Sequence, residues 1–219
     1  MTRPADPIAF YFDFVSPYAY LALGRAEQSA HAHGRTLDLR PVLLGVTVMR
    51  IMGLKPLPQT PLKGDYVRAD VERLARLYDV PFRHHGLAEV NPVCALRAFL
   101  WIKQHDPLRA RAFARRVFER LWVHGLDISR PEHFADDAAA AGLQASLLPA
   151  ACESPESREA LRRAVGELVA QGVFGVPFFI ADGEPFWGGD RLPMLEHWLT
   201  HHSWNPAPAA AAGASAVHR

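Results

Sequence analysis

A buried strand that leads directly into a helix opens the chain, and this junction restricts the fold more than any other feature. Residues 8–12 are apolar without a break, and Ser16-Pro17 then begins a helical pattern that stops near Gly34. Ser is a favoured N-cap, and Pro is favoured at the first helical position because the amide that it lacks would be unpaired there. A second apolar segment over 37–44 follows, which predicts a right-handed β-α-β unit.

Ser16 has two interpretations that the junction alone does not separate. As an ordinary N-cap it accepts a backbone N–H of the first turn, although Ala19 replaces the acid or amide of a capping box. As a functional group, its hydroxyl lies where unpaired amides and the partial positive charge of a helix N-terminus attract anions. In that case it would assist a bound anion.

Composition argues against several classes of partner. The 219 residues carry 24 basic and 23 acidic side chains, so the net charge of +1 gives no reason to expect nucleic acid or an anionic membrane surface. No apolar run approaches the ~18 residues of a membrane span, and no apolar signal segment precedes the first strand. We therefore expect a cytoplasmic protein without a membrane segment.

The cysteines and paired histidines predict neither a redox motif nor a metal site. Cys94 and Cys152 are far apart in the sequence and match no CxxC or zinc-ligand spacing, so we expect two small buried apolar groups. His84-His85 and His201-His202 are adjacent pairs, which do not repeat the i, i+4 spacing of helical zinc ligands. No metal is expected.

A long helical region interrupts the α/β pattern. It begins with a segment over 45–61 that glycine and proline break repeatedly, which predicts a loop. Amphipathic stretches then follow one another as far as Gln171. Strands resume over 176–181 and 184–187 around a hairpin turn, and a last helix covers 192–201.

Two glycine-rich segments near the end of the chain complete a pattern with Ser16. In the first, a proline opens a short strand beside a glycine-rich turn, so Val176-Pro177 is a candidate cis peptide. Such a turn leaves the backbone of Val176 free to pair with an extended peptide. In the second, Gly189 and Asp190 precede the last helix, where Asp190 is either an N-cap or a ligand-binding carboxylate.

Several motifs along the chain now combine in order. They are Phe12-Asp-Phe-Val-Ser-Pro-Tyr-Ala-Tyr-Leu21, Pro61-Leu-Lys-Gly-Asp-Tyr66 with Asp70, Asn91-Pro-Val-Cys-Ala-Leu-Arg97, Gly172-Val-Phe-Gly-Val-Pro177 and Phe186-Trp-Gly-Gly-Asp-Arg-Leu192. With them, residues 7–202 resemble the 2-hydroxychromene-2-carboxylate isomerases and the related kappa-class glutathione transferases, which belong to the DsbA-like branch of the thioredoxin superfamily.

The resemblance implies an α/β, thioredoxin-like fold with a large all-helical insertion domain. The expected thioredoxin-like domain consists of residues 1–45 and 172–204, and the helix over 156–171 joins it. Residues 46–155 are expected to form the helical insertion domain, and 205–219 a disordered tail.

The resemblance also implies a glutathione site. Ser16 stands where redox relatives carry the first cysteine of CxxC, and without a thiol in Ser16–Ala19 this motif cannot exchange disulfides. In the family the serine hydroxyl hydrogen-bonds the glutathione sulfur and favours the thiolate, so Ser16 is the expected catalytic residue. Lys63 would face a glutathione carboxylate, unless it is simply a surface lysine. The full set of expected cofactor-binding residues is Ser16, Lys63, Val176, Pro177, Gly189, Asp190 and Arg191.

The implied activity is a glutathione-dependent isomerisation of 2-hydroxychromene-2-carboxylate to trans-o-hydroxybenzylidenepyruvate, a step of aromatic hydrocarbon catabolism. Two alternatives remain: a kappa-like glutathione transferase or peroxidase, and a non-catalytic thioredoxin-fold module that binds a thiol peptide or a protein partner. Gly53-Leu54 departs from the family, which often has asparagine after this glycine to reach the cofactor or substrate. The aromatic substrate is therefore not identified, although Phe99, Trp101 and Trp187 are candidates for lining its pocket. Relatives are commonly dimers, so a homodimer is expected.

Overall fold

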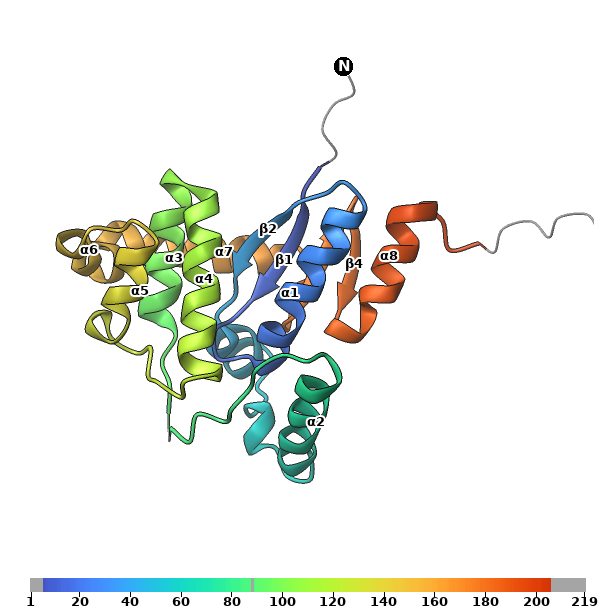
Figure 1. Cartoon of the computed structure of the whole chain (residues 1–219), viewed down its shortest axis with the longest axis horizontal. Coiled ribbons are helices and arrows are strands. Elements are labelled where there is room, and N and C mark those ends of the chain that lie inside the picture. The colour runs from blue at the N-terminus through green and yellow to red at the C-terminus, as the bar shows by residue number, and fades with distance from the viewer. Residues whose placement is uncertain (1–5, 88, 206–219) are drawn as a thin grey trace, which may run out of the picture.

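The computed structural model describes residues 6–87 and 89–205, and its centre is a mixed sheet of four strands (Figure 1). The strand order is β2-β1-β3-β4, where β2 is parallel to β1 and the other neighbours are antiparallel. The bounds are β1 Ile8–Phe12, β2 Leu37–Pro41, β3 Phe178–Ala181 and β4 Glu184–Trp187.

Helices connect the strands and cover the sheet. In Figure 1 α1 lies in front of the sheet and α7 behind it. The helices before and within the long helical region are α1 Pro17–Ala32, η1 Gly45–Ile51, η2 Leu57–Gln59, α2 Lys63–Leu77, α3 Val93–His105, α4 Pro107–Trp122, η3 Pro131–Phe134, α5 Ala135–Ala140, η4 Ala145–Leu147, α6 Leu148–Glu153 and α7 Pro155–Ala170. The chain then ends with η5 Gly189–Arg191 and α8 Leu192–His201.

The predicted β-α-β unit, hairpin and last helix are confirmed, whereas the predicted loop is wrong over η1. Its seven residues form a π-helical segment that is capped where the Met52 N–H donates to the Thr47 carbonyl at 3.1 Å. The reason is that no proline or glycine follows Gly45 until Gly53, so the chain can continue its helical turns.

Several helices begin with the same local chemistry, a polar cap followed by proline. Ser16 caps α1, Asp106 caps α4 and Ser154 caps α7, and each side chain accepts a backbone N–H of its first turn. In each case proline occupies a position whose amide would be unpaired. The sequence therefore specifies these helix starts locally.

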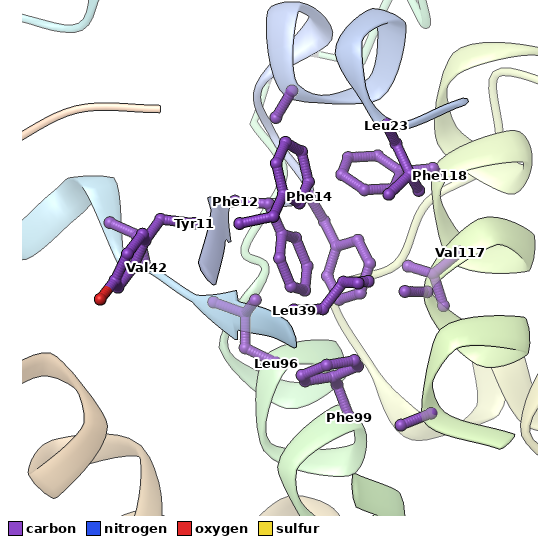
Figure 2. Packing of buried hydrophobic residues seen from close by; sticks show 14 of the residues in the cluster. Tyr11, Phe12, Phe14, Leu23, Leu39, Val42, Leu96, Phe99, Val117 and Phe118 are labelled. Carbon is purple, nitrogen blue, oxygen red and sulfur yellow. The ribbon is translucent and has the colours of Figure 1, made fainter. Parts of the chain in front are cut away.

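One apolar cluster extends from the sheet into the helical region. Figure 2 shows Phe12 and Phe14, from the end of β1 and the following turn, among side chains of α3 and α4. The Phe12 ring lies 5.1 Å from that of Phe99, and the Phe14 ring lies 5.1 Å from that of Phe118. Phe99 is therefore a core residue, 1% exposed, and the hollow that it borders lies between β2, α3 and the start of α4. A smaller cluster of Leu21, Val67, Val71 and Ala75 joins α1 to α2.

Three expectations concern the C-terminal tail, membrane-spanning segments and the domain boundaries. The predicted tail over 205–219 lies, after Asn205, outside the described residues. Within the described part of the chain, none of the helices is both long enough and apolar enough to span a membrane. The predicted domain boundaries stay a prediction, since the core is shared between the two parts.

Candidate active site

Strand register brings three distant segments to one edge of the sheet. Tyr11 near the end of β1 pairs with Phe178 at the start of β3, and Phe178 pairs with Trp187 at the end of β4. Because β1 and β3 are antiparallel, the turn after β1 and the turn before β3 leave the sheet at the same edge. The turn after β4 leaves there as well. These turns contain the sequence-predicted residues Ser16, Val176-Pro177 and Gly189-Asp190.

Gly189 allows the backbone of η5 to lie close to α1 and to the turn before β3. A Cβ atom added to Gly189 would lie 3.3 Å from the Cβ of Ala22 in α1 and 4.0 Å from the Cγ of Pro177. The Gly188 N–H also donates to the Pro177 carbonyl at 2.9 Å. The backbone of η5 therefore lies directly against both α1 and the turn that opens β3. We call the group of Ser16, Val176, Pro177, Gly189 and Asp190 the Ser16 site.

Ser16 is the N-cap of α1, and its hydroxyl retains an unused hydrogen. Its Oγ accepts the Ala19 N–H at 3.2 Å, and its side chain and backbone together are 6% exposed. No acceptor for the hydroxyl hydrogen lies among the residues that the structure describes. The first turn of α1 also carries no acidic residue, so nothing on the helix offsets the partial positive charge of its N-terminus. The predicted N-cap is confirmed, and the same oxygen can still donate to an anion.

The turn before β3 presents an unpaired backbone. The Val176–Pro177 peptide bond is cis, which confirms the prediction for this bond. Within residues 6–87 and 89–205, neither the N–H nor the C=O of Val176 has a hydrogen-bond partner. Val176 is only partly buried. An extended peptide that reached this edge could therefore pair with it as an additional strand does.

Asp190 and Arg191 form an exposed ion pair at the mouth of α8. Arg191 Nη1 lies 2.9 Å from Asp190 Oδ2, and the Asp190 side chain is 70% exposed. The alternative interpretation of Asp190 as an N-cap is wrong, since Arg191 occupies the cap position and no side chain bonds the first turn. The physical reason is that Asp190 lies within η5, which precedes α8, and that Pro193 in the first turn of α8 has no N–H to donate.

Lys63 lies at the first position of α2 and is exposed. Tyr18 holds this helix against α1, because its hydroxyl donates to Asp70 Oδ2 at 3.1 Å. Asp70 follows Lys63 by about two helical turns. No contact joins Lys63 to Ser16 among the described residues, so its part in the site stays a prediction.

Asp13 is a feature of the site that sequence reasoning missed. It is fully buried just before Ser16, and its carboxyl oxygens accept the Leu44 N–H at 2.9 Å and the Val15 N–H at 3.3 Å. Burial raises its pKa from 3.8 to about 7, although these backbone N–H groups oppose the shift. The carboxyl thus joins the turn after β1 to the turn after β2. The only local signal was a charged residue that interrupts an apolar run.

Two aromatic residues, Phe174 and Trp187, lie next to segments of the Ser16 site. The Trp187 ring lies 4.8 Å from that of Phe174, and the two residues are 57% and 39% exposed. Gly175 separates Phe174 from Val176 and leaves room for the Trp187 indole. Trp187 therefore remains a candidate for contact with an apolar ligand, whereas Trp101 lies in α3 beside His105. Leu54, at the position where the resemblance leads us to expect asparagine, is 52% exposed.

Comparisons with known proteins identify the family of the chain. The family model described as a DSBA-like thioredoxin domain matches residues 7–200. The chain belongs to this family. A 2-hydroxychromene-2-carboxylate isomerase of Sphingobium xenophagum is 31% identical over 201 residues, which cover 91% of this chain and 99% of the relative.

Further relatives of the DSBA-like thioredoxin family fall into the same two groups. The kappa 1 glutathione S-transferase of Rattus norvegicus is 26% identical and covers 92% of this chain and 94% of its own length. A solved structure of a 2-hydroxychromene-2-carboxylate isomerase superposes with a TM-score of 0.79 at 28% identity, covering 88% of this chain and 94% of that chain. The recognised family and its thioredoxin-like fold are therefore confirmed.

Proposed function

We propose that the chain is a glutathione-dependent isomerase whose cofactor binds at the Ser16 site. The donors and acceptors present fit a tripeptide thiol. Val176 offers an unpaired N–H and C=O to its peptide backbone, and Ser16 offers a hydroxyl hydrogen to its sulfur. Asp190 and Arg191 offer opposite charges to its ammonium and carboxylate groups.

The observation that carries the proposal is the free hydroxyl hydrogen of Ser16. The Ala19 N–H donates to the Ser16 oxygen, so the hydroxyl hydrogen is available to a ligand in the site. A hydrogen bond to a charged sulfur is stronger than one to a neutral thiol, and the N-terminus of α1 adds to the same preference. Ser16 would therefore lower the pKa of a bound thiol without itself attacking anything.

The proposed reaction converts 2-hydroxychromene-2-carboxylate into trans-o-hydroxybenzylidenepyruvate. When bound, glutathione would supply the thiolate nucleophile for a reversible addition to the conjugated system, which lets the former double bond rotate. Ser16 would hydrogen-bond the sulfur and stabilise its negative charge. Val176 and Asp190 keep the cofactor in one orientation, and Trp187 offers an apolar surface beside it for the aromatic ring. The small aromatic substrate and the homodimer expected for the family are part of this proposal.

Substitution of Ser16 by alanine tests the proposal. Loss of a hydrogen bond to a charged group costs about 1.5–3 kcal/mol, so Ser16→Ala should lower kcat about 10- to 100-fold. The pKa of the bound thiol, measured from thiolate absorbance, should rise, while calorimetry should still detect glutathione binding through Val176 and Asp190.

Ser29→Ala is the matched control. Ser29 is also buried in α1, 5% exposed, and its Oγ has no partner among the described residues, but it lies several turns from the site. Its replacement should leave kcat and the thiol pKa unchanged. Absence of glutathione binding to the wild-type chain would refute the proposal as a whole. Unchanged turnover of Ser16→Ala would refute the role of Ser16 alone.

A kappa-like transferase is a second candidate that one observation favours. Exposed Leu54 replaces the asparagine by which family members often reach the cofactor or substrate, and an apolar contact there suits hydrophobic electrophiles more broadly. Conjugation of chlorodinitrobenzene to glutathione without isomerisation of the chromene would decide for this candidate. Glutathione binding with neither reaction would instead indicate a binding module.

A further inference from the structure

The two cysteines of the chain meet in the helical region. Cys94 lies in the first turn of α3, and Cys152 lies at the end of α6. Helix α6 packs against α3, and Arg97, one turn after Cys94, donates to the Cys152 carbonyl at 3.0 Å, so the two free thiols lie near each other. The expectation of two small buried apolar groups holds for Cys152 and is wrong for Cys94, which is partly exposed. No local pattern in the sequence reveals that the two residues are neighbours, because this depends on the packing of α6 against α3.

The two thiols differ in their surroundings. Cys94 is partly exposed, whereas Cys152 is fully buried. The neighbouring Cys152 thiol lowers the pKa of Cys94, and burial opposes this shift. The neighbouring Cys94 thiol, together with burial, raises the pKa of Cys152. Cys94 is also in the first turn of a helix of 13 residues, where the helix N-terminus favours a thiolate. Cys94 is thus the accessible nucleophile, and Cys152 is the protected partner.

A cation lies beside the pair. Arg97 is one helical turn after Cys94, and its Nη1 donates to the Cys152 carbonyl at 3.0 Å. Its Nε is buried and has no hydrogen-bond partner in the described part of the chain. The charge of Arg97 favours a thiolate at Cys94, whereas Glu153 and Glu132 oppose it. The carbonyl contact also fixes the end of α6 near α3.

From this arrangement we propose that Cys94 and Cys152 form a dithiol–disulfide pair that reacts with small-molecule disulfides such as glutathione disulfide. The Cys94 thiolate attacks one sulfur of the oxidant, which forms a mixed disulfide and releases one thiolate. Cys152 then attacks the Cys94 sulfur, and its proton passes to the second leaving thiolate. The chain loses two electrons and two protons, and the oxidant is reduced to two thiols.

This site is separate from the Ser16 site. Figure 1 draws α6 at the outer edge of the helical region, whereas α1 lies in front of the sheet. The proposal does not rest on the proposed function, since the Ser16 site has no thiol of its own. A disulfide here would join α6 to the start of α3 and remove a loop-closure entropy from the unfolded chain.

The test uses the purified full chain and its only two cysteines. Incubation with glutathione disulfide, and separately with hydroxyethyl disulfide, is followed by alkylation and peptide mass spectrometry. The expected result is loss of both free thiols, a mass decrease of about 2 Da for the intact chain, and a Cys94–Cys152 cross-linked peptide. A reaction with hydroxyethyl disulfide shows that recognition of glutathione is not needed.

Serine variants establish the order of attack. Cys152→Ser should accumulate one mixed disulfide at Cys94, whereas Cys94→Ser should stay unmodified. Timed alkylation of the unmodified wild-type dithiol gives the same order without any substitution, with Cys94 labelled first. The proposal is overturned if both thiols remain free after oxidation, if Cys152 reacts first, or if the disulfide joins two chains.

Discussion

Asp13 shows how a single residue couples the candidate site to pH. Its carboxyl group is fully buried, and burial raises its pKa from 3.8 to about 7. A raised pKa means that the folded chain favours the protonated form relative to the unfolded chain. The stability that results is fully present below the unfolded pKa and is lost as the pH rises towards and through about 7.

Asp13→Asn should therefore change the pH dependence of stability. The amide stays neutral at every pH, although it can accept only one of the two backbone N–H groups, from Val15 and Leu44, that the carboxyl accepts. A difference of about three pKa units corresponds to about 4 kcal/mol. We expect the wild type to lose up to this amount, relative to the variant, between about pH 4 and pH 8, measured by urea unfolding.

Asp182→Asn provides the control. The hydrogen bond from Arg35, at 2.8 Å, lowers the pKa of Asp182 despite partial burial. A lowered pKa contributes stability above the unfolded pKa, and this is lost only as the pH falls below it. The difference between this variant and the wild type should stay constant from about pH 5 to pH 8. A constant difference for Asp13→Asn as well would contradict the raised pKa.

Local chemistry decides which residues of the site are predictable. The strand, the serine cap and the proline are neighbours in sequence, so Ser16 was identified before the fold was known. Asp13 accepts the N–H of Leu44, which follows another strand, and the pKa of Cys94 is lowered by Cys152, a residue in another helix. No short pattern contains either pair. Such features become visible only when the packing of the elements is known.

Among the elements, η5 follows a glycine, Gly188, whose backbone conformation and surroundings leave no room for a side chain. Gly188 has φ +107° and ψ 146°, a conformation that other residues adopt only with strain. A Cβ atom there would lie 2.2 Å from Asp190 Oδ1. Gly188→Ala should lower the free energy of unfolding by about 1–3 kcal/mol and displace the Asp190 carboxylate. Thermal unfolding and glutathione calorimetry would measure the two effects.

Gly166→Ala is the matched control for this prediction. Gly166 is exposed in the middle of α7, and an added Cβ would meet no atom within 4 Å. Because alanine is the better helix former, this variant should be more stable by up to about 1 kcal/mol and should bind glutathione as the wild type does. If Gly188→Ala is equally harmless, then η5 is not held in the conformation described above.

Element boundaries followed from the sequence wherever a cap or a turn residue marked them. The helix after Ser16 begins where serine and proline predict, α7 begins at Pro155 rather than at the expected residue 156, and β3 and β4 flank Asp182 and Gly183, both with positive φ. The π-helical η1 was not predictable, because no side chain caps its first turn and its seven residues lack a clear period. The Leu44 N–H, just before η1, bonds Asp13, a contact between segments that are distant in sequence.

For the whole molecule, the shared core bears on whether the sheet and the helical region unfold separately. Phe118 of α4 is fully buried against Phe12, Phe14 and Tyr20, which precede the helical region in sequence. Trp122 of the same helix donates from Nε1 to the Phe14 carbonyl at 2.8 Å. Neither part could bury these groups alone. We therefore expect one cooperative transition, in spite of the apparent two-part organisation of the sequence.

Phe118→Ala tests this expectation. Removal of a buried phenylalanine costs about 3–5 kcal/mol, and the loss should shift the urea midpoints of circular dichroism and of tryptophan fluorescence equally. Leu108→Ala, at the exposed start of the same helix with Leu108 75% exposed, should leave both midpoints nearly unchanged, with an unfolding free energy within about 0.5 kcal/mol of the wild type. Two separate transitions, or a shift in only one signal, would mean that the helical region folds independently. Coincident shifts would mean that the helical region and the strand-to-helix junction at Ser16 are stabilised together, because Phe12, Phe14 and Phe118 pack in one core.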